Sequence, residues 1–197
     1  LPAYLCNLRD QYSNFLDGII TDDIVLHQEM EAYLKEYQPE DLSKLKLYSD
    51  ELPLKVLYSF EQRLKEALQK KVWLKSGATL VIEPTEALTV IDVNTGKAVK
   101  GRARGEEHFL EINLEAAKEI AFQIRLRNLS GIILVDFIDM EREESDAVLL
   151  RALKEYLSAD PVKTTLVDMT PLHLVEITRK KVRRPLHEEG FERILGN

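Results

Sequence analysis

The stretch TVIDVNTGK, residues 89–97, runs along an apolar predicted strand and then places an aspartate, Asp92, near the strand's end. A second stretch, GIILVDFIDM at residues 131–140, does the same with Asp136. An ionised carboxylate in a strand that is apolar on both faces is costly unless it is paired or bound to a cation. Two such strands in one chain indicate an α/β sheet with a functional site at one of its edges.

The polar groups of these two strands form a candidate metal site. Side chains alternate along a strand, so Asp92 and Asn94 point to the same face, roughly 6 to 7 Å apart. If the two strands are neighbours, the carboxylate of Asp136 converges with that of Asp92. Carboxylate and carboxamide oxygens suit Mg²⁺, with Mn²⁺ as a substitute, and such an ion binds phosphate oxygens. The pattern therefore predicts metal-assisted phosphoryl transfer.

A structural interpretation stays open on periodicity alone. An aspartate after an apolar strand is often a turn residue or a helix cap. The same reasoning favours Asn113 as the cap of a helix over residues 111–128 and Ser145 as the cap of the next helix. Trp73 is expected to pack in a core rather than to stack on a base.

Composition limits the class of protein. The 197 residues are 45% hydrophobic and 31% charged, which is typical of a globular chain. No apolar run approaches the roughly 20 residues that span a bilayer, and no signal peptide is evident, so the cytoplasm is expected. Cys6 is the single cysteine, which excludes an internal disulfide and a cysteine-based zinc site within one chain.

The charge distribution allows contact with a polyanion only through local patches. The net charge of −7 argues against gripping nucleic acid with the whole surface. Two basic stretches, at residues 97–104 and 178–185, are candidates. The first follows Asn94 closely, and the second suits a solvated helix end as well as an RNA backbone contact. The predicted RNA contacts are Lys97, Lys100, Arg102, Arg179 and Lys180.

The pattern along the chain predicts two lobes, at residues 1–75 and 76–197. In the first lobe, periodicity predicts helices over 2–15, 22–38 and 51–69 and strands over 17–21 and 44–49. In the second, it predicts strands within 71–83, 84–94, 130–138 and 163–168 and helices over 111–128, 145–158 and 171–182. Alternating strands and helices of this kind predict a layered, mixed α/β sheet behind a small α/β lobe.

Three ordered motifs resemble the ribonuclease E/G family of bacterial endoribonucleases. They are EALTVIDVNTGK at 86–97, NLEAAKEIAFQIRLRNLSGIILVDFIDM at 113–140 and LVEITRKKVRRPL at 174–186. The resemblance implies that Asp92 and Asp136 hold a catalytic Mg²⁺ and that Asn94 contributes to the site. It implies cleavage of single-stranded RNA by a metal-activated water, leaving a 5′-monophosphate on the downstream fragment. It also implies a DNase I-like fold for the second lobe and part of an RNase H-like fold for the first.

The sequence also departs from this family. The family's oligonucleotide-binding domain, its sensor for the RNA 5′-monophosphate and its paired-cysteine zinc link have no match here. Together with a first residue that is leucine, this predicts a catalytic-core segment of a longer RNA-processing enzyme, and a homo-oligomer of that longer protein is left open. Two alternatives remain: a non-catalytic RNA-binding or assembly module, and a metal-dependent phosphohydrolase of small nucleotides.

Overall fold

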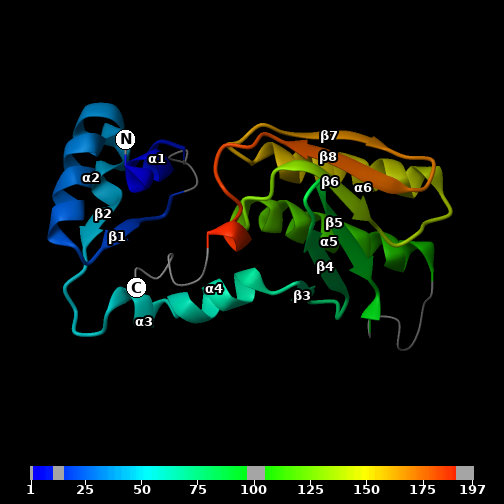
Figure 1. Ribbon diagram of the computed structural model, residues 1–197, viewed down its shortest axis with the longest axis horizontal. Coiled ribbons are helices and arrows are strands. Elements are labelled where there is room, and N and C mark those ends of the chain that lie inside the picture. The colour runs from blue at the N-terminus through cyan, green and yellow to red at the C-terminus, as the bar shows by residue number, and fades with distance from the viewer. Residues whose placement is uncertain (1, 11–15, 97–104, 190–197) are drawn as a thin grey trace. The chain divides into compact units, whose positions relative to one another are not determined.

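The computed structural model describes residues 2–10, 16–96 and 105–189. The chain divides into two compact units, Leu1–Leu64 and Lys65–Asn197. Residues 65–75, which the sequence pattern places in the first lobe, lie in the second unit, where they start its sheet. Both units mix helices with strands, which confirms the α/β class; the likenesses to RNase H and DNase I stay predictions (Figure 1).

The first unit packs helices against a two-stranded parallel sheet. Helix α2 begins after Asp23, whose carboxylate accepts the backbone N–H groups of Val25 and Leu26 at 2.7 and 3.1 Å, as expected for a helix cap. The predicted helix over 51–69 is interrupted at Ser59, which has a left-handed φ of 50°. The elements are α1 (Ala3–Asp10), β1 (Ile19–Thr21), α2 (Ile24–Tyr37), a 3₁₀ helix (Pro39–Lys44), β2 (Leu45–Leu47), α3 (Leu54–Leu57) and α4 (Phe60–Leu68), which runs into the second unit.

The second unit is built on a six-stranded mixed sheet. The strand order is β3-β4-β5-β6-β8-β7, and only the β5–β6 pair is parallel. That parallel pair is joined through the long helix α5, as a crossover requires. The strands are β3 (Lys71–Trp73), β4 (Thr79–Pro84), β5 (Leu88–Asn94), β6 (Gly131–Asp136), β7 (Thr164–Met169) and β8 (Leu174–Arg179); the helices are α5 (Glu106–Leu126), α6 (Glu143–Ser158) and a 3₁₀ turn (Leu186–Glu188).

One face of this sheet carries the hydrophobic core. Alternate residues of the central strands pack with the apolar stripes of α5 and α6, which lie on the same side of the sheet (Figure 1). The most deeply buried strand residues include Ile91, Ile133, Val135, Val175 and Ile177, each 0% exposed. Between them, the intervening residues point to the opposite face, where Val90 and Leu134 are only half-buried. The central strands are therefore covered by α5 and α6 on one face, and on the other face Val90 and Leu134 keep part of their surface exposed.

The predicted helix over residues 171–182 is wrong. Residues 174–179 form β8, which pairs antiparallel with both β6 and β7. Val175, Ile177 and Arg179 are buried while Thr178 is exposed, the alternation of a strand. A basic run that looked like a solvated helix end therefore begins inside the sheet.

Candidate functional site

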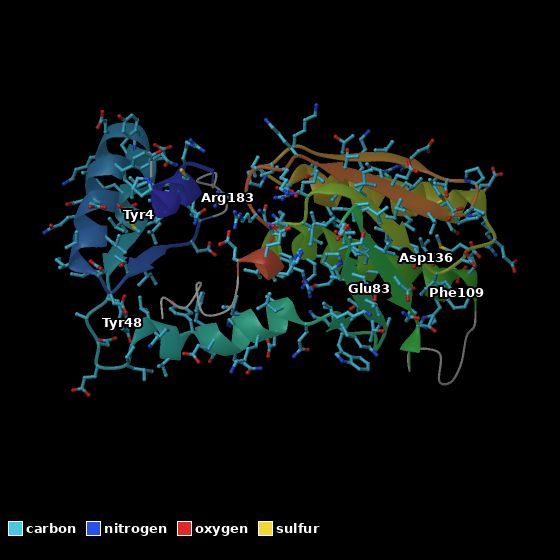
Figure 2. The ribbon with its side chains drawn as sticks, viewed as in Figure 1. Tyr4, Tyr48, Glu83, Phe109, Asp136 and Arg183 are labelled. Atoms are coloured by element: carbon cyan, nitrogen blue, oxygen red, sulfur yellow. The ribbon has the colours of Figure 1, made fainter. Side chains whose placement is uncertain are left out.

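Asp92 and Asp136 lie side by side on adjacent strands. In the parallel β5–β6 ladder, Asp92 is the direct register partner of Asp136. Register partners project to the same face, here the face that α5 and α6 leave open. The condition for the two carboxylates to converge, that their strands are neighbours, is met. Asp92 is half-buried and Asp136 is exposed at the end of β6, where Figure 2 labels it.

The two carboxylates are like charges, and among the residues that the structure describes the register places them directly beside each other. The pKa of the Asp136 carboxyl is raised, first by desolvation and then by the negative charges of Asp92 and Asp139. Asn94 is exposed and its amide Nδ2 donates to Asp92 Oδ2 at 2.6 Å. The two side chains share a face, as their two-residue spacing predicts, and Asn94 orients the Asp92 carboxylate; its predicted contribution to a metal site stays a prediction. A bound cation would relieve the repulsion between the two carboxylates.

A close backbone approach shapes the end of β5. Gly96 has a φ of 52°, and a Cβ placed there would lie 2.8 Å from the carbonyl oxygen of Gly77 in the β3–β4 turn. A side chain at position 96 would push the two segments apart. The glycine that follows Asn94 in the NTG sequence thus keeps the β5 end against the β3–β4 turn.

Asn113 is not a helix cap. Helix α5 begins at Glu106 after Gly105, and Asn113 lies inside it, 0% exposed. Its Nδ2 donates to the Ile138 carbonyl at 2.8 Å and its Oδ1 accepts the Ile138 N–H at 3.0 Å. One side chain therefore satisfies both backbone groups of a residue two positions after Asp136. Asn113 fixes the path of the chain that leaves the candidate site.

Further carboxylates surround the segment after β6. Glu106 accepts the N–H groups of Glu141 and Arg142 at 2.9 and 3.0 Å, and these bonds lower its pKa. Burial raises the pKa of Asp146, although His173, whose Nδ1 lies 3.8 Å from Asp146 Oδ2, opposes the rise. The acidic run 141–146 starts helix α6, as predicted. Ser145 is not the cap, because α6 begins after Arg142 and Ser145 is buried within it.

The donor set fits a hard divalent cation. Asp92 and Asp136 offer carboxylate oxygens on one face, and Asn94 holds one of them in place. Their mutual repulsion favours a doubly charged ion over a neutral ligand. The described residues contain no cluster of three or more His, Cys, Asp or Glu side chains that could hold a metal by themselves. An ion held by the two carboxylates would need phosphate oxygens or water as further ligands.

The predicted RNA contacts fall into three groups. Lys97, Lys100 and Arg102 lie outside the described residues. Lys180 is exposed just beyond β8, consistent with a surface contact. Arg179 is 5% exposed, and its guanidinium donates to Asp160, to the Asn128 side chain and to the Leu129 carbonyl. Its predicted contact with RNA finds no support here, because strand alternation turns the side chain inward.

Trp73 is exposed, contrary to the expectation that it packs in a core. The side chain is 63% exposed on the edge strand β3. The register links Trp73 to Thr79 in β4 and Thr79 to Asn94 in β5, so Trp73 lies on the same face as the two aspartates.

Comparison with known proteins identifies the family. A model of the ribonuclease E/G family matches residues 2–182. This chain belongs to the ribonuclease E/G family. Ribonuclease G of Salmonella typhimurium (strain SL1344) is 43% identical over 190 residues, 96% of this chain and 38% of the relative. Ribonuclease G of Haemophilus influenzae is 44% identical over 91% of this chain and 36% of the relative, and ribonuclease E of Nostoc sp. is 38% identical over 92% and 27%.

These relatives are much longer than the matched region. The chain spans about 38% of the length of the ribonuclease G relatives that it matches. The match covers both the first unit and the sheet with Asp92 and Asp136. In the part of this chain that the structure describes, no helix is long and apolar enough to cross a membrane.

Proposed function

We propose that this chain is the catalytic core of a divalent-metal-dependent endoribonuclease that hydrolyses phosphodiester bonds in single-stranded RNA. The observation that carries the proposal is the register of Asp92 and Asp136 on one face of the sheet, in a chain of the ribonuclease E/G family. Mg²⁺ is the proposed ion, and Mn²⁺ is a suitable substitute. RNA processing and decay in the cytoplasm is the proposed setting.

The proposed roles follow from the contacts of each side chain. Asp92 and Asp136 would hold the ion, and the Asn94 amide keeps the Asp92 carboxylate in one orientation. When bound, the ion supplies charge neutralisation and polarisation of the phosphate. Asn113 holds the backbone at Ile138, which keeps the Asp136 end of β6 from shifting. Lys97, Lys100, Arg102 and Lys180 are proposed to meet the RNA backbone.

The net reaction breaks the bond between phosphorus and the 3′ oxygen. The oxygen of water ends on phosphorus, so the downstream fragment carries a 5′-monophosphate. One proton of the water ends on the 3′ oxygen, so the upstream fragment leaves with a 3′ hydroxyl, and the other proton stays on the new phosphate oxygen or passes to solvent.

A chimera tests the proposal, because absence of cleavage by a chain that spans only part of its relatives has more than one explanation. This chain replaces the matching 190 residues of the Salmonella typhimurium ribonuclease G, so that the other parts of that relative are present. The chimera and the chain alone are each incubated with labelled single-stranded RNA and Mg²⁺. We expect cleavage by the chimera, products that a 5′-monophosphate-dependent exonuclease degrades, and loss of cleavage in Asp92→Asn and Asp136→Asn.

The control variant is Glu155→Gln, which removes an exposed carboxylate of α6. Cleavage by both aspartate variants at the rate of the unmodified chimera would refute the site. A folded chimera that binds RNA without cutting it would favour the non-catalytic module instead.

A further inference from the structure

The open face of the sheet carries an exposed aromatic and a cation beside the carboxylate pair. Lys71 and Trp73 are both exposed in β3, and the Lys71 Nζ lies 4.6 Å from the centre of the Trp73 ring. This is a cation–π contact, in which the ammonium group covers part of the ring. The remaining ring surface is open, because the side chain as a whole is 63% exposed.

The strand register places this pair in line with the candidate catalytic residues. Lys71 pairs with Val81, Val81 with Asp92 and Asp92 with Asp136, so one row crosses the face from β3 to β6. In the adjacent row, Trp73 is linked through Thr79 to Asn94. With neighbouring strands about 4.8 Å apart, the backbone of Trp73 lies roughly 10 Å from that of Asn94.

The β3–β4 turn that follows Trp73 is fixed to the body of the unit. Glu115 of α5 accepts the N–H groups of Lys75 and Ser76 at 2.7 and 3.2 Å. Leu74, next to Trp73, donates its N–H to the Ala78 carbonyl at 2.9 Å and is buried. The exposed ring therefore sits on a held backbone, which limits the entropy lost when a planar ligand packs on it.

We propose that Trp73 and Lys71 form a stacking subsite for an unpaired base of single-stranded RNA, on the same sheet face as Asp92 and Asp136. Aromatic rings bind bases of any sequence through stacking, and a nearby lysine attracts the phosphate backbone. Lys71 brings positive charge to a face that also bears Glu83, labelled in Figure 2, and Glu176. The subsite would hold a nucleotide near the bond to be cut. The inference rests on the RNA substrate proposed above.

The single tryptophan of the chain makes this subsite directly observable. Intrinsic fluorescence is recorded as a single-stranded RNA oligonucleotide is added to the full chain, and again with the duplex of the same sequence. We expect quenching by the single strand and little by the duplex, whose bases are already stacked. Absence of quenching, or equal quenching by the duplex, would overturn the proposal.

Affinity measurements with labelled RNA then separate stacking from charge. Trp73→Ala is expected to weaken binding about 5- to 150-fold, from the usual range for loss of one stacked base, whereas Trp73→Phe should keep most of the affinity. Lys71→Gln should make the negative slope of log affinity against log salt shallower by about 0.7. Phe122→Ala, which removes another exposed aromatic from α5, should leave affinity unchanged. Equal affinity of Trp73→Ala and the unmodified chain would refute the subsite.

The readout does not depend on cleavage. Quenching of the chain by RNA together with absence of cleavage by the folded chimera would refute the proposed hydrolysis and leave the subsite in place. Cleavage without quenching would refute the subsite and leave the proposed hydrolysis in place. Unfolding curves for Trp73→Ala should match those of the unmodified chain, since the residue is exposed on an edge strand.

Discussion

Two acidic sites of the sheet unit show opposite electrostatic arrangements. Asp160 is almost fully buried and faces Arg179, with Arg179 Nε 2.7 Å from Asp160 Oδ2. Asp136 is exposed and faces another carboxylate, that of Asp92, across the strand register. Burial acts to raise the pKa of both carboxyls, but at Asp160 the bonds from Arg179 and Thr164 outweigh it and hold the pKa below its usual value. The first arrangement pairs opposite charges, whereas the second places two like charges side by side, where the proposed cation would bind.

The largest expected effect is on cleavage and metal binding at the site of Asp92 and Asp136, called here the unpaired site. In the chimera, Asp92→Asn or Asp136→Asn should lower the cleavage rate by at least about a thousandfold, since polarisation by a metal is worth several kcal/mol in the transition state. Titration of the chain with Mn²⁺ should show weakened binding in the same variants. Asp160→Asn, measured under conditions where circular dichroism shows the protein folded, should change neither measurement. If Asp160→Asn abolished Mn²⁺ binding while Asp92→Asn did not, the contrast between the two sites would be reversed.

The next effect is on the free energy of unfolding, through the buried Asp160–Arg179 ion pair, called here the paired site. Arg179→Leu leaves the Asp160 carboxylate buried without its cation, and the free energy of unfolding should fall by about 3 kcal/mol. The lower end of the usual range is expected because Thr164 Oγ1 and the Val162 N–H still donate to Asp160. Urea unfolding measures the change, with Lys180→Leu, the exposed neighbour, as the matched control. A loss below 1 kcal/mol would mean that Arg179 adds little to the fold.

The pH dependence of stability should have opposite signs at the two sites. A folded pKa below the usual 3.8 means that Asp160 contributes stability above that pH and loses it as the pH falls through the folded pKa. A raised pKa at Asp136 means that its ionisation costs stability as the pH rises through the range above 3.8. Unfolding curves across acid pH should therefore show a smaller acid fall in Asp160→Asn and a smaller opposing trend in Asp136→Asn. Identical slopes in the two variants would contradict the contrast.

The smallest expected effect is a gain in stability. Asp136→Asn removes one of two like charges from an exposed position, so stability should rise slightly or stay within about 0.5 kcal/mol. Thermal unfolding of the chain without added metal measures it. A marked destabilisation would show that Asp136 supports the fold in the way that Asp160 does.

The sequence predicts the unpaired site better than the paired one. Asp92 and Asp136 stand out because each follows an apolar strand, and adjacent parallel strands bring such residues together. The Asp160–Arg179 pair leaves no such signal, because it depends on β8 being a strand, and the basic run after Thr178 resembled a helix end. The alternation of Val175, Ile177 and Arg179 with Glu176 and Thr178 is the pattern that identifies the strand.

Two further residues show what periodicity does and does not reveal. Asn113 binds Ile138, a partner that only tertiary structure brings near, so its role has no local signal. Trp73 has one: it alternates with buried Leu74 and half-buried Val72, which assigns it to the face of Lys71. The expectation that Trp73 is buried follows tryptophan's general preference for protein interiors and disregards this pattern.

The parallel pairing of β5 with β6 makes the candidate site a reporter of folding. Asp92 and Asp136 are joined through the whole of α5, so neither strand can supply half of a working site by itself. Closing that long connection is entropically costly and becomes favourable only once the helix docks on the sheet. Occupancy of the site by a cation should therefore rise and fall with the cooperative unfolding of the entire sheet, and Mn²⁺ should raise the unfolding temperature of this unit in proportion to its binding.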